Sequence, residues 1–256
     1  MANYDLLGNI AIVKFPKEAK KEEKLRKAET LLKNPSIKTV LEKTNKVSGR
    51  LRTIKTKYIL GEKTKIAEYR ENGCVFKFNV ETCYFSPRLA NERIEIARMV
   101  KKNENVLVMF AGVAPFSIVI AKVAKPKKII SIELGKECCR YAEENVIKNR
   151  VENTIRVLQG DVKRIIPSLK EKFDFIVMAR PNLKESFIKE ALAVSKKGTR
   201  IIYYGFSSEE KKDVMVKELL QETNKLKRKI KILDVKEAGD IAPYEHRYRI
   251  EMTVEN

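Results

Sequence analysis

The feature of this sequence that most constrains its fold is a regular alternation of strand-like and helix-like segments after residue 104. Short apolar runs, of the length of buried strands, are separated by longer stretches in which apolar residues recur at helical spacing. Because parallel strands need crossover connections, this alternation predicts a doubly wound α/β sheet, and the last two strands are expected to include an antiparallel pair. The expected strands are Asn105–Phe110, Lys128–Leu134, Thr154–Leu158, Phe173–Met178, Thr199–Tyr204, Lys229–Val235 and His246–Val254, and the expected helices are a segment ending at Ala124, Lys136–Arg150, Lys184–Lys196 and Glu209–Leu226.

The first 83 residues predict a separate, small α+β domain. Their strand-like segments alternate polar and apolar residues, and two of them, on either side of Gly61, are expected to pair as a hairpin. We therefore expect an antiparallel sheet that carries one or two helices. The expected strands are Asn9–Lys14, Ile54–Leu60, Thr64–Tyr69 and Gly73–Val80, and the expected helix is Lys17–Leu32.

A helix over residues 84–103 is expected to join this small domain to the rest of the chain. Pro87 stands near its start, and apolar residues follow along one face. The predicted domains are therefore residues 1–83 and residues 84–256, with 84–103 as the linker helix.

The charge of the chain favours a nucleic-acid partner. Its 256 residues contain 54 Lys and Arg against 34 Asp and Glu, a formal net charge of +20. Such an excess creates a positive field that attracts polyanions. Its apolar runs, such as Val106–Phe110, are far shorter than the roughly 18 residues of a membrane span. Without a signal-peptide segment either, a cytoplasmic location without membrane contact is expected.

Cysteine and histidine usage limits the available chemistry. The four cysteines show neither zinc-ligand spacing nor a disulfide framework, and His246 is the single histidine. We therefore expect no metal site, and acid–base chemistry must come from other groups.

Four candidate ligand-binding segments follow the first four strands of the predicted sheet, where open α/β sheets bind ligands. They are the Gly112 loop in FAGVAPFS, Glu133, Gly160-Asp161-Val162 and Ala179-Arg180-Pro181. Each has an ordinary alternative, since Gly112 suits any tight turn, acidic residues commonly begin helices, and Asp161 suits a helix N-cap. Their order and spacing nevertheless favour S-adenosylmethionine over a dinucleotide, for which three glycines would be expected and only Gly112 is present.

Longer motifs make the sequence similar to a known family. YFSPRLANERIEIA (84–97), MFAGVAPFSI (109–118), EENVIKN (143–149), GDV (160–162) and IAPYEHRYRIEM (241–252) resemble the archaeal and eukaryotic tRNA (guanine-37-N1)-methyltransferases. The wybutosine-pathway aminocarboxypropyl transferases, which share the fold, are also similar. The resemblance covers nearly the whole chain. It implies a class I, Rossmann-like methyltransferase domain, S-adenosyl-L-methionine as cofactor, the anticodon region of tRNA as partner, and a monomer.

The resemblance also implies roles for single residues. Glu92 matches the residue that acts as general base toward guanine N1, and Arg52 matches the cation that stabilises O6. Tyr84 and Arg88, the latter expected to contact the substrate, match residues that line the same pocket. A surface ion pair of Glu92 with Arg93, and a phosphate-contacting or solvated Arg52, are the alternatives. Lysine-rich stretches, with Arg88 and Arg93, are expected to hold tRNA phosphates where they are not simply solvated. The implied cofactor residues are Arg93, Phe110, Ala111, Gly112, Val113, Glu133, Leu134, Asp161, Val162, Ala179 and Pro181.

The sequence departs from the family pattern at three positions. The family's Asn-x-Pro motif is replaced by Ala179-Arg180-Pro181, an expected acid by Val108, and the second glycine of the loop by Ala114. Residues 52–61 resemble the aminocarboxypropyl transferases at least as closely. Methyl transfer to guanine N1 is the favoured hypothesis, aminocarboxypropyl transfer and a catalytically silent RNA-binding paralogue stay open, and the charge disfavours a small-molecule methyltransferase.

Overall fold

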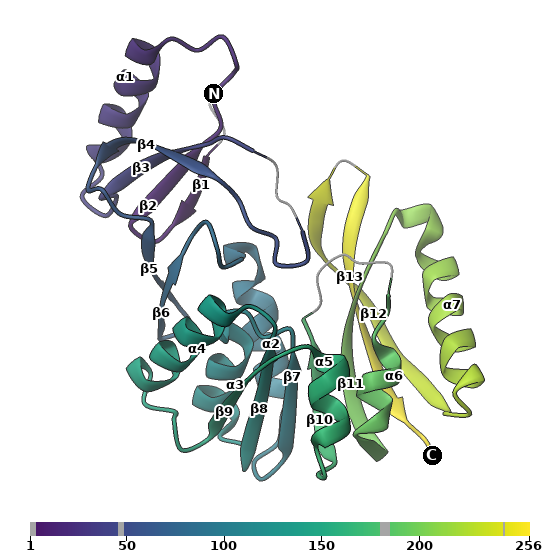
Figure 1. Cartoon of the computed structure of the whole chain (residues 1–256). Coiled ribbons are helices and arrows are strands. Elements are labelled where there is room, and N and C mark those ends of the chain that lie inside the picture. The colour runs from purple at the N-terminus through teal and green to yellow at the C-terminus, as the bar shows by residue number, and fades with distance from the viewer. Residues whose placement is uncertain (1–3, 46–48, 180–184, 243) are drawn as a thin grey trace.

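The computed structural model describes residues 4–45, 49–179, 185–242 and 244–256 (Figure 1). A small N-terminal sheet lies beside the carboxyl ends of the strands of a larger sheet. The larger sheet has the order β12-β13-β11-β10-β7-β8-β9, in which β7 to β11 run parallel and β13 is antiparallel to both of its neighbours. Its strands are β7 (Asn105–Met109), β8 (Lys128–Glu133), β9 (Ile155–Gln159), β10 (Phe173–Met178), β11 (Ser195–Ser207), β12 (Ile230–Ala242) and β13 (Glu245–Val254).

Alternate residues of the buried strands supply two cores, one on each face of the large sheet. Val106 and Val108 of β7 join one cluster, whereas Leu107 and Met109 join the other. Successive side chains of a strand point to opposite faces, so a strand covered on both sides is apolar throughout. The predicted doubly wound sheet with its terminal antiparallel pair is confirmed. The covering helices are α2 (Ala90–Met99), α3 (Pro115–Ala124) and α4 (Lys136–Lys148) on one face and α5 (Val162–Ile165), α6 (Ile188–Ala193) and α7 (Lys212–Lys225) on the other, with short 3-10 turns η1 (Pro87–Leu89), η2 (Ile166–Ser168) and η3 (Glu209–Lys211).

The small sheet differs from the expected antiparallel arrangement. It has the order β1-β2-β3-β4, and β2 and β3 run parallel because helix α1 connects them. The short strands β1 and β3 were not expected, and β4 pairs with β3 instead of with the segment after Gly61. The predicted hairpin across Gly61 is therefore wrong. The elements are β1 (Tyr4–Leu7), β2 (Ile10–Val13), α1 (Lys21–Leu32), β3 (Thr39–Lys43) and β4 (Thr56–Gly61).

A separate hairpin, β5 (Ile66–Glu71) and β6 (Cys74–Asn79), packs against α4 of the large domain. Asn149 and Asn145 of α4 hydrogen-bond both backbone groups of Val75 and Lys77, at 2.7 to 3.1 Å. These bonds satisfy the open edge of β6, which would otherwise expose unpaired backbone groups. The asparagines of the EENVIKN motif thus attach the hairpin to the large domain.

Several predicted helices are shorter in the structure, and two of them differ most. The linker begins as a 3-10 turn at Pro87, continues as α2 and ends before Val100, whose backbone is extended. The predicted helix over 184–196 is observed as α6, and strand β11 starts at Ser195; residue 184 lies outside the described residues. The boundary between residues 83 and 84 remains a prediction.

Candidate active site and cofactor pocket

A pocket opens at the carboxyl ends of β7 to β10, beneath a segment of the small domain. With its open mouth it contains about 1100 Å³ of empty space, enough for a nucleoside cofactor and part of a second molecule. Residues 49–55, which lead into β4 of the small sheet, lie beside it (Figure 1) and contribute Arg50, Leu51 and Arg52. The predicted site residues that line the pocket are Arg52, Tyr84, Arg93, Phe110, Ala111, Gly112, Glu133, Leu134, Asp161, Val162 and Ala179.

The loop between β7 and α3 forms the floor of the pocket. Phe110, Gly112 and Ala114 all have positive φ angles, of 61°, 57° and 65°. This conformation turns the chain sharply and brings the first N–H groups of α3, which have no partner within the helix, to the pocket. Ala114 adopts the left-handed conformation that a second glycine would adopt more easily. Alanine therefore occupies this position in a left-handed conformation that is uncommon for residues other than glycine.

Glu133, the last residue of β8, organises this loop from beneath. Its carboxylate accepts the N–H of Gly112 at 2.8 Å and the N–H of Gly135 at 2.7 Å, and it is 8% exposed. Burial raises the pKa of Glu133, although the N–H groups of Gly135, Gly112 and Leu134 act in the opposite direction. A carboxylate offers about four lone-pair sites, so both oxygens retain capacity for further hydroxyl donors. This is the donor and acceptor chemistry that a ribose requires.

Asp161 caps a helix, which is the alternative role that the sequence analysis gave for this residue. It is the N-cap of α5, and its carboxylate accepts the N–H of Lys163 at 3.0 Å. It also accepts from Arg50 of the small domain at 3.1 Å. Burial alone would raise the pKa of Asp161, but the N–H of Lys163 and the Arg50 guanidinium hold it below its usual value. The cofactor role of Asp161 remains a prediction.

Replacement of Asp161 tests that role. Asp161→Ala is expected to weaken S-adenosylmethionine binding about tenfold, through loss of a charged acceptor, and to cost about 1 kcal/mol of stability through loss of the cap. Isothermal titration and urea unfolding measure the two effects. Asp161→Asn retains the cap and should restore stability. Unchanged affinity in Asp161→Ala would limit this residue to its capping role.

Arg52 and Tyr84 form a stacked pair at the pocket mouth. The Arg52 guanidinium lies 4.1 Å from the centre of the Tyr84 ring, within the range of a cation–π interaction. Among the described residues no group accepts a hydrogen bond from Arg52 Nε, which is buried. Arg52 has a positive φ of 55°, an uncommon conformation that a functional site can retain. The pair presents an unused donor beside an aromatic face, which suits a planar acceptor such as a base.

Glu92 lies behind the pocket wall. It is 6% exposed, accepts the Tyr204 hydroxyl at 3.0 Å and pairs with Arg249 at 3.0 Å. Tyr204 lines the pocket, so a single hydroxyl separates the carboxylate from it. A surface ion pair of Glu92 with Arg93 is wrong, because each pairs with a different buried residue. The role of Glu92 as general base remains a prediction.

Arg93 forms a buried ion pair with Glu71. The two side chains are 1% and 3% exposed, and Arg93 also donates to the carbonyl of Ser86 at 3.0 Å. The pair fastens the β5–β6 hairpin to α2. The expectation that Arg93 holds tRNA phosphates is wrong, because its side chain is buried and its charge is paired with Glu71 inside the protein. Contact of Arg93 with the cofactor remains a prediction.

Loss of the Glu71 charge should be strongly destabilising. Glu71→Gln leaves the buried Arg93 charge uncompensated and is expected to cost about 3 kcal/mol of unfolding free energy. Urea denaturation measures the effect. Glu68→Gln, on the same strand, removes an exposed pair with Lys148 and should cost less than about 1 kcal/mol. Equal stabilities of the two variants would contradict a structural role for the buried pair.

Besides Glu92, two predicted residues in the described part of the chain do not line the pocket. The Val113 side chain is fully buried in the core, because its carbonyl accepts from Asn145 and the turn directs it inward. Arg88 lies on the surface, 3.8 Å from Asp5, since η1 turns it away from the pocket. Contact of Val113 and Arg88 with the pocket is therefore wrong in this structure. Pro181 lies outside the described residues.

Several pocket residues were not predicted. Arg50 reaches Asp161 from the small domain, and Tyr204 and Arg247 line the pocket from β11 and β13. Within β13 the signal was an alternation of the charged residues Arg247, Arg249 and Glu251 with Tyr248, Ile250 and Met252. Charges at every second position of a buried strand face one side, so they must meet partners or a ligand there.

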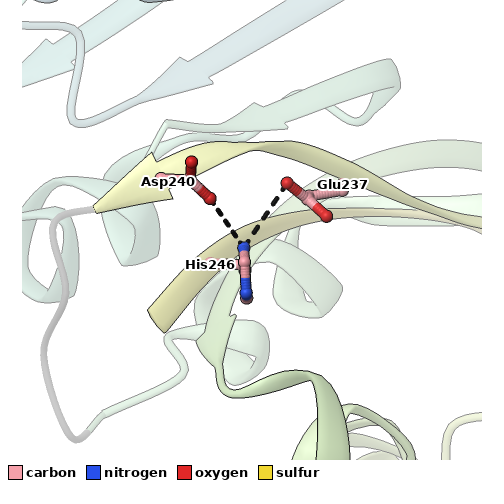
Figure 2. A group of neighbouring side chains, drawn as sticks. All are labelled: Glu237, Asp240 and His246. Atoms are coloured by element: carbon pink, nitrogen blue, oxygen red, sulfur yellow. Dashed lines mark hydrogen bonds and ion pairs between the residues drawn. The ribbon is translucent and has the colours of Figure 1, made fainter. Parts of the chain in front are cut away.

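Potential metal ligands gather at one place in the described part of the chain. Glu237, Asp240 and His246 lie near the end of the β12–β13 hairpin at which β12 leads into β13 (Figure 2). His246 Nδ1 lies 2.7 Å from Asp240 and 3.4 Å from Glu237, and both carboxylates are exposed. Adjacent residues of a strand face opposite sides, so His246 points away from the pocket that Arg247 lines. The group is a surface cluster beside the site, in which His246 and Asp240 share a hydrogen bond.

The fold and the pocket define the class of the protein. The strand order, the positive-φ loop before α3 and the acidic residue at the end of β8 are those of a class I methyltransferase domain, with S-adenosylmethionine as cofactor. The residues present suit this nucleoside, because Glu133 has free acceptor capacity for a ribose and Phe110, Ile132 and Val162 supply apolar walls. No helix in the described ranges has the length and apolarity to cross a membrane.

The chain belongs to the TRM5/TYW2 methyltransferase family. The TRM5/TYW2 methyltransferase domain matches residues 67–235, and the TYW2 N-terminal domain matches residues 1–64. The predicted family and fold class are thereby confirmed. The match of the first 64 residues to a TYW2-type domain agrees with the likeness of residues 52–61 to the aminocarboxypropyl transferases.

Individual relatives are similar over almost the entire chain. Pyrococcus abyssi tRNA (guanine(37)-N(1))-methyltransferase Trm5b is 34% identical over 253 residues, which cover 98% of this chain and 74% of the relative. Its crystal structure superposes with a TM-score of 0.87 over 99% of this chain and 75% of that one. Nanoarchaeum equitans Taw22, named as a tRNA (guanine(37)-N(1))/4-demethylwyosine(37)-methyltransferase, is 33% identical over 97% of this chain and 98% of its own. A complex of aTrm5 with tRNALeu is 27% identical, with a TM-score of 0.85 over 99% of this chain and 72% of that one.

Proposed function

We propose that this protein transfers a methyl group from S-adenosylmethionine to N1 of guanine-37 of tRNA. The observation that carries the proposal is the Arg52–Tyr84 stack at the mouth of the cofactor pocket, where Arg52 Nε has no acceptor among the described residues. The names of the relatives and the tRNA complex of a similar structure support the same substrate.

The cofactor residues have two tasks, to bind and to orient. S-adenosylmethionine supplies a methyl group on a positively charged sulfur, from which a nucleophile can take it. Glu133 would accept the ribose hydroxyls while it keeps the Gly112 turn in place. The apolar side chains of Phe110 and Val162 would enclose the adenine and exclude water. Ala179, in place of the family's asparagine, offers no side-chain hydrogen bond, so orientation of the reacting groups falls to Arg52 and Tyr204.

Guanine N1 becomes nucleophilic when it loses its proton. Arg52 would donate to O6, which gains negative charge as the proton leaves, and Glu92 is the base that finally accepts it. The Tyr204 hydroxyl lies between Glu92 and the pocket. Its oxygen would take the N1 proton while its own proton passes to Glu92 Oε2. The phenol would thus end the step neutral. The deprotonated N1 would then take the methyl carbon from sulfur, and sulfur would keep the electron pair of the broken carbon–sulfur bond.

The acceptor base must leave its stack to reach this pocket. Extrusion from a nearly single-stranded loop costs a few kcal/mol. The net charge of +20 attracts the phosphates around it, so affinity for tRNA should decrease steeply with salt. Because one chain holds all of the pocket residues, we propose that the enzyme acts as a monomer. We also propose that its location is cytoplasmic and that its reaction requires no metal ion.

Aminocarboxypropyl transfer is the second candidate, favoured by the TYW2-type match of residues 1–64. The two reactions move different parts of the same cofactor. The protein is incubated with unmodified tRNA carrying guanine-37, or with tRNA carrying the wyosine precursor. Each reaction contains methyl-labelled or carboxyl-labelled S-adenosylmethionine, and nucleoside mass spectrometry identifies the product.

Three results are distinguishable in this assay. Methyl label on N1 of guanine-37 is the expected result. Carboxyl label on the wyosine precursor would replace the proposal with the second candidate. Cofactor binding without any transfer would indicate a catalytically silent RNA-binding paralogue.

A further inference from the structure

We propose that Arg247 binds a phosphate of the acceptor nucleotide, the nucleotide whose base enters the pocket. The inference deepens the proposed function and rests on it for the identity of the acceptor. Arg247 belongs to β13, lines the pocket and is only 7% exposed. In the described part of the protein its side chain forms no ion pair and donates no hydrogen bond. Its guanidinium carbon lies 5.7 Å from the centre of the Phe206 ring.

The other arginines around the pocket have partners. Arg50 pairs with Asp161, Arg93 with Glu71, and Arg52 stacks on Tyr84. Arg249, two residues along β13, pairs with Glu92, Glu95 and Glu251. Removal of a guanidinium from water is costly unless an anion compensates it. Arg247 therefore lacks the counter-charge that the buried Arg93 and Arg249 have, and an anionic ligand in the pocket can supply it.

The strand order places Arg247 in the part of the pocket that is left for the acceptor nucleotide. Glu133 ends β8, and β13 lies four strand spacings away, roughly 19 Å at about 4.8 Å per strand. With Val162 beside its base, a nucleoside bound at Glu133 would occupy the ends of β8 and of its two neighbours, β7 and β9. The ends of β11 and β13, with Tyr204 and Arg247, are left for the second molecule.

The chemistry of the acceptor nucleotide indicates which group Arg247 holds. Arg52 lies against the Tyr84 ring, so a base that stacks there has a cation beside its oxygen atom. A nucleotide that leaves its stack carries its phosphodiesters into the pocket mouth. A guanidinium presents parallel N–H donors that match two phosphate oxygens, and such charge-assisted pairs are strong.

The test uses anticodon stem–loop RNAs in which one phosphate flanking nucleotide 37 is replaced by an uncharged methylphosphonate, on its 5′ or its 3′ side. Fluorescence anisotropy measures their affinity for the wild-type protein, for Arg247→Ala and for Arg156→Ala, which removes an exposed charge from β9. The wild type should lose about tenfold with one of the two modified RNAs. Arg247→Ala should bind the unmodified RNA about tenfold more weakly and be insensitive to both modifications, whereas Arg156→Ala should stay sensitive.

Titration of S-adenosylmethionine shows that the variant is folded, and Arg247→Lys, which retains charge without the paired donors, provides a second variant. Persistent sensitivity of Arg247→Ala to the methylphosphonates would overturn the proposal. So would a loss of cofactor affinity with unchanged RNA binding, which would assign Arg247 to the cofactor carboxylate. The readout needs no methyl transfer, so an inactive wild type that shows phosphate-dependent binding through Arg247 would refute only the proposed function.

Discussion

Glu92→Gln should lower the rate of methyl transfer to tRNA by about 10²- to 10³-fold while affinity for S-adenosylmethionine stays within about twofold of wild type. Glutamine has nearly the same shape as glutamate and can still accept from Tyr204 and Arg249, so the buried network keeps its geometry. It cannot take up a proton at neutral pH. Single-turnover kinetics at saturating tRNA, together with calorimetric titration of the cofactor, separates the two effects.

Glu95→Gln is the matched control on the same helix. Glu95 also pairs with Arg249, but it is half-exposed and does not contact Tyr204. This variant should retain nearly full activity. Equal losses in the two variants would mean that the ion pairs of Arg249, rather than proton transfer to Glu92, limit the reaction. Loss of cofactor binding in Glu92→Gln would likewise refute its assignment as the base.

Glu133→Ala should weaken S-adenosylmethionine binding by about 100-fold, the second large effect. The truncation leaves the N–H groups of Gly112 and Gly135 without their acceptor, and each unsatisfied buried donor costs about 1–3 kcal/mol. The loop that carries α3 to the pocket loses its support, and the ribose loses its acceptor. Equilibrium dialysis with labelled cofactor measures the change.

Glu137→Ala is the corresponding control, because Glu137 stands four residues later on α4 and is half-exposed. Its cofactor affinity should equal that of the wild type. The Glu133→Ala protein should still bind the anticodon stem–loop, since Arg52 and Arg247 are unchanged. Full cofactor affinity in Glu133→Ala would show that the loop holds its shape unaided and that the ribose is bound elsewhere.

The large sheet could be predicted from the sequence because its signals are local. Each buried strand carries its own apolar run, and each crossover helix its own periodicity, as β7 and α4 illustrate. Glu133 and Asp161 were found by the same logic, since residues that follow parallel strands must gather at one edge. The small sheet was predicted less well, because β1 and β3 are short and β3 takes as its partner the strand that β5 was expected to pair with.

The partners of the charged residues were decided by the tertiary structure alone. The sequence determined that Glu92 and Arg93 are neighbours on a helix, and the resemblance suggested what they do. Packing against β13 pairs Glu92 with Arg249, and packing against β11 brings Tyr204 to Glu92. Packing against the β5–β6 hairpin pairs Arg93 with Glu71, whereas Arg247 has no counter-charge among the described residues. A local pattern shows which face a charge occupies, but the energy of a buried charge depends on groups more than a hundred residues away, which only the folded chain brings within a few ångströms.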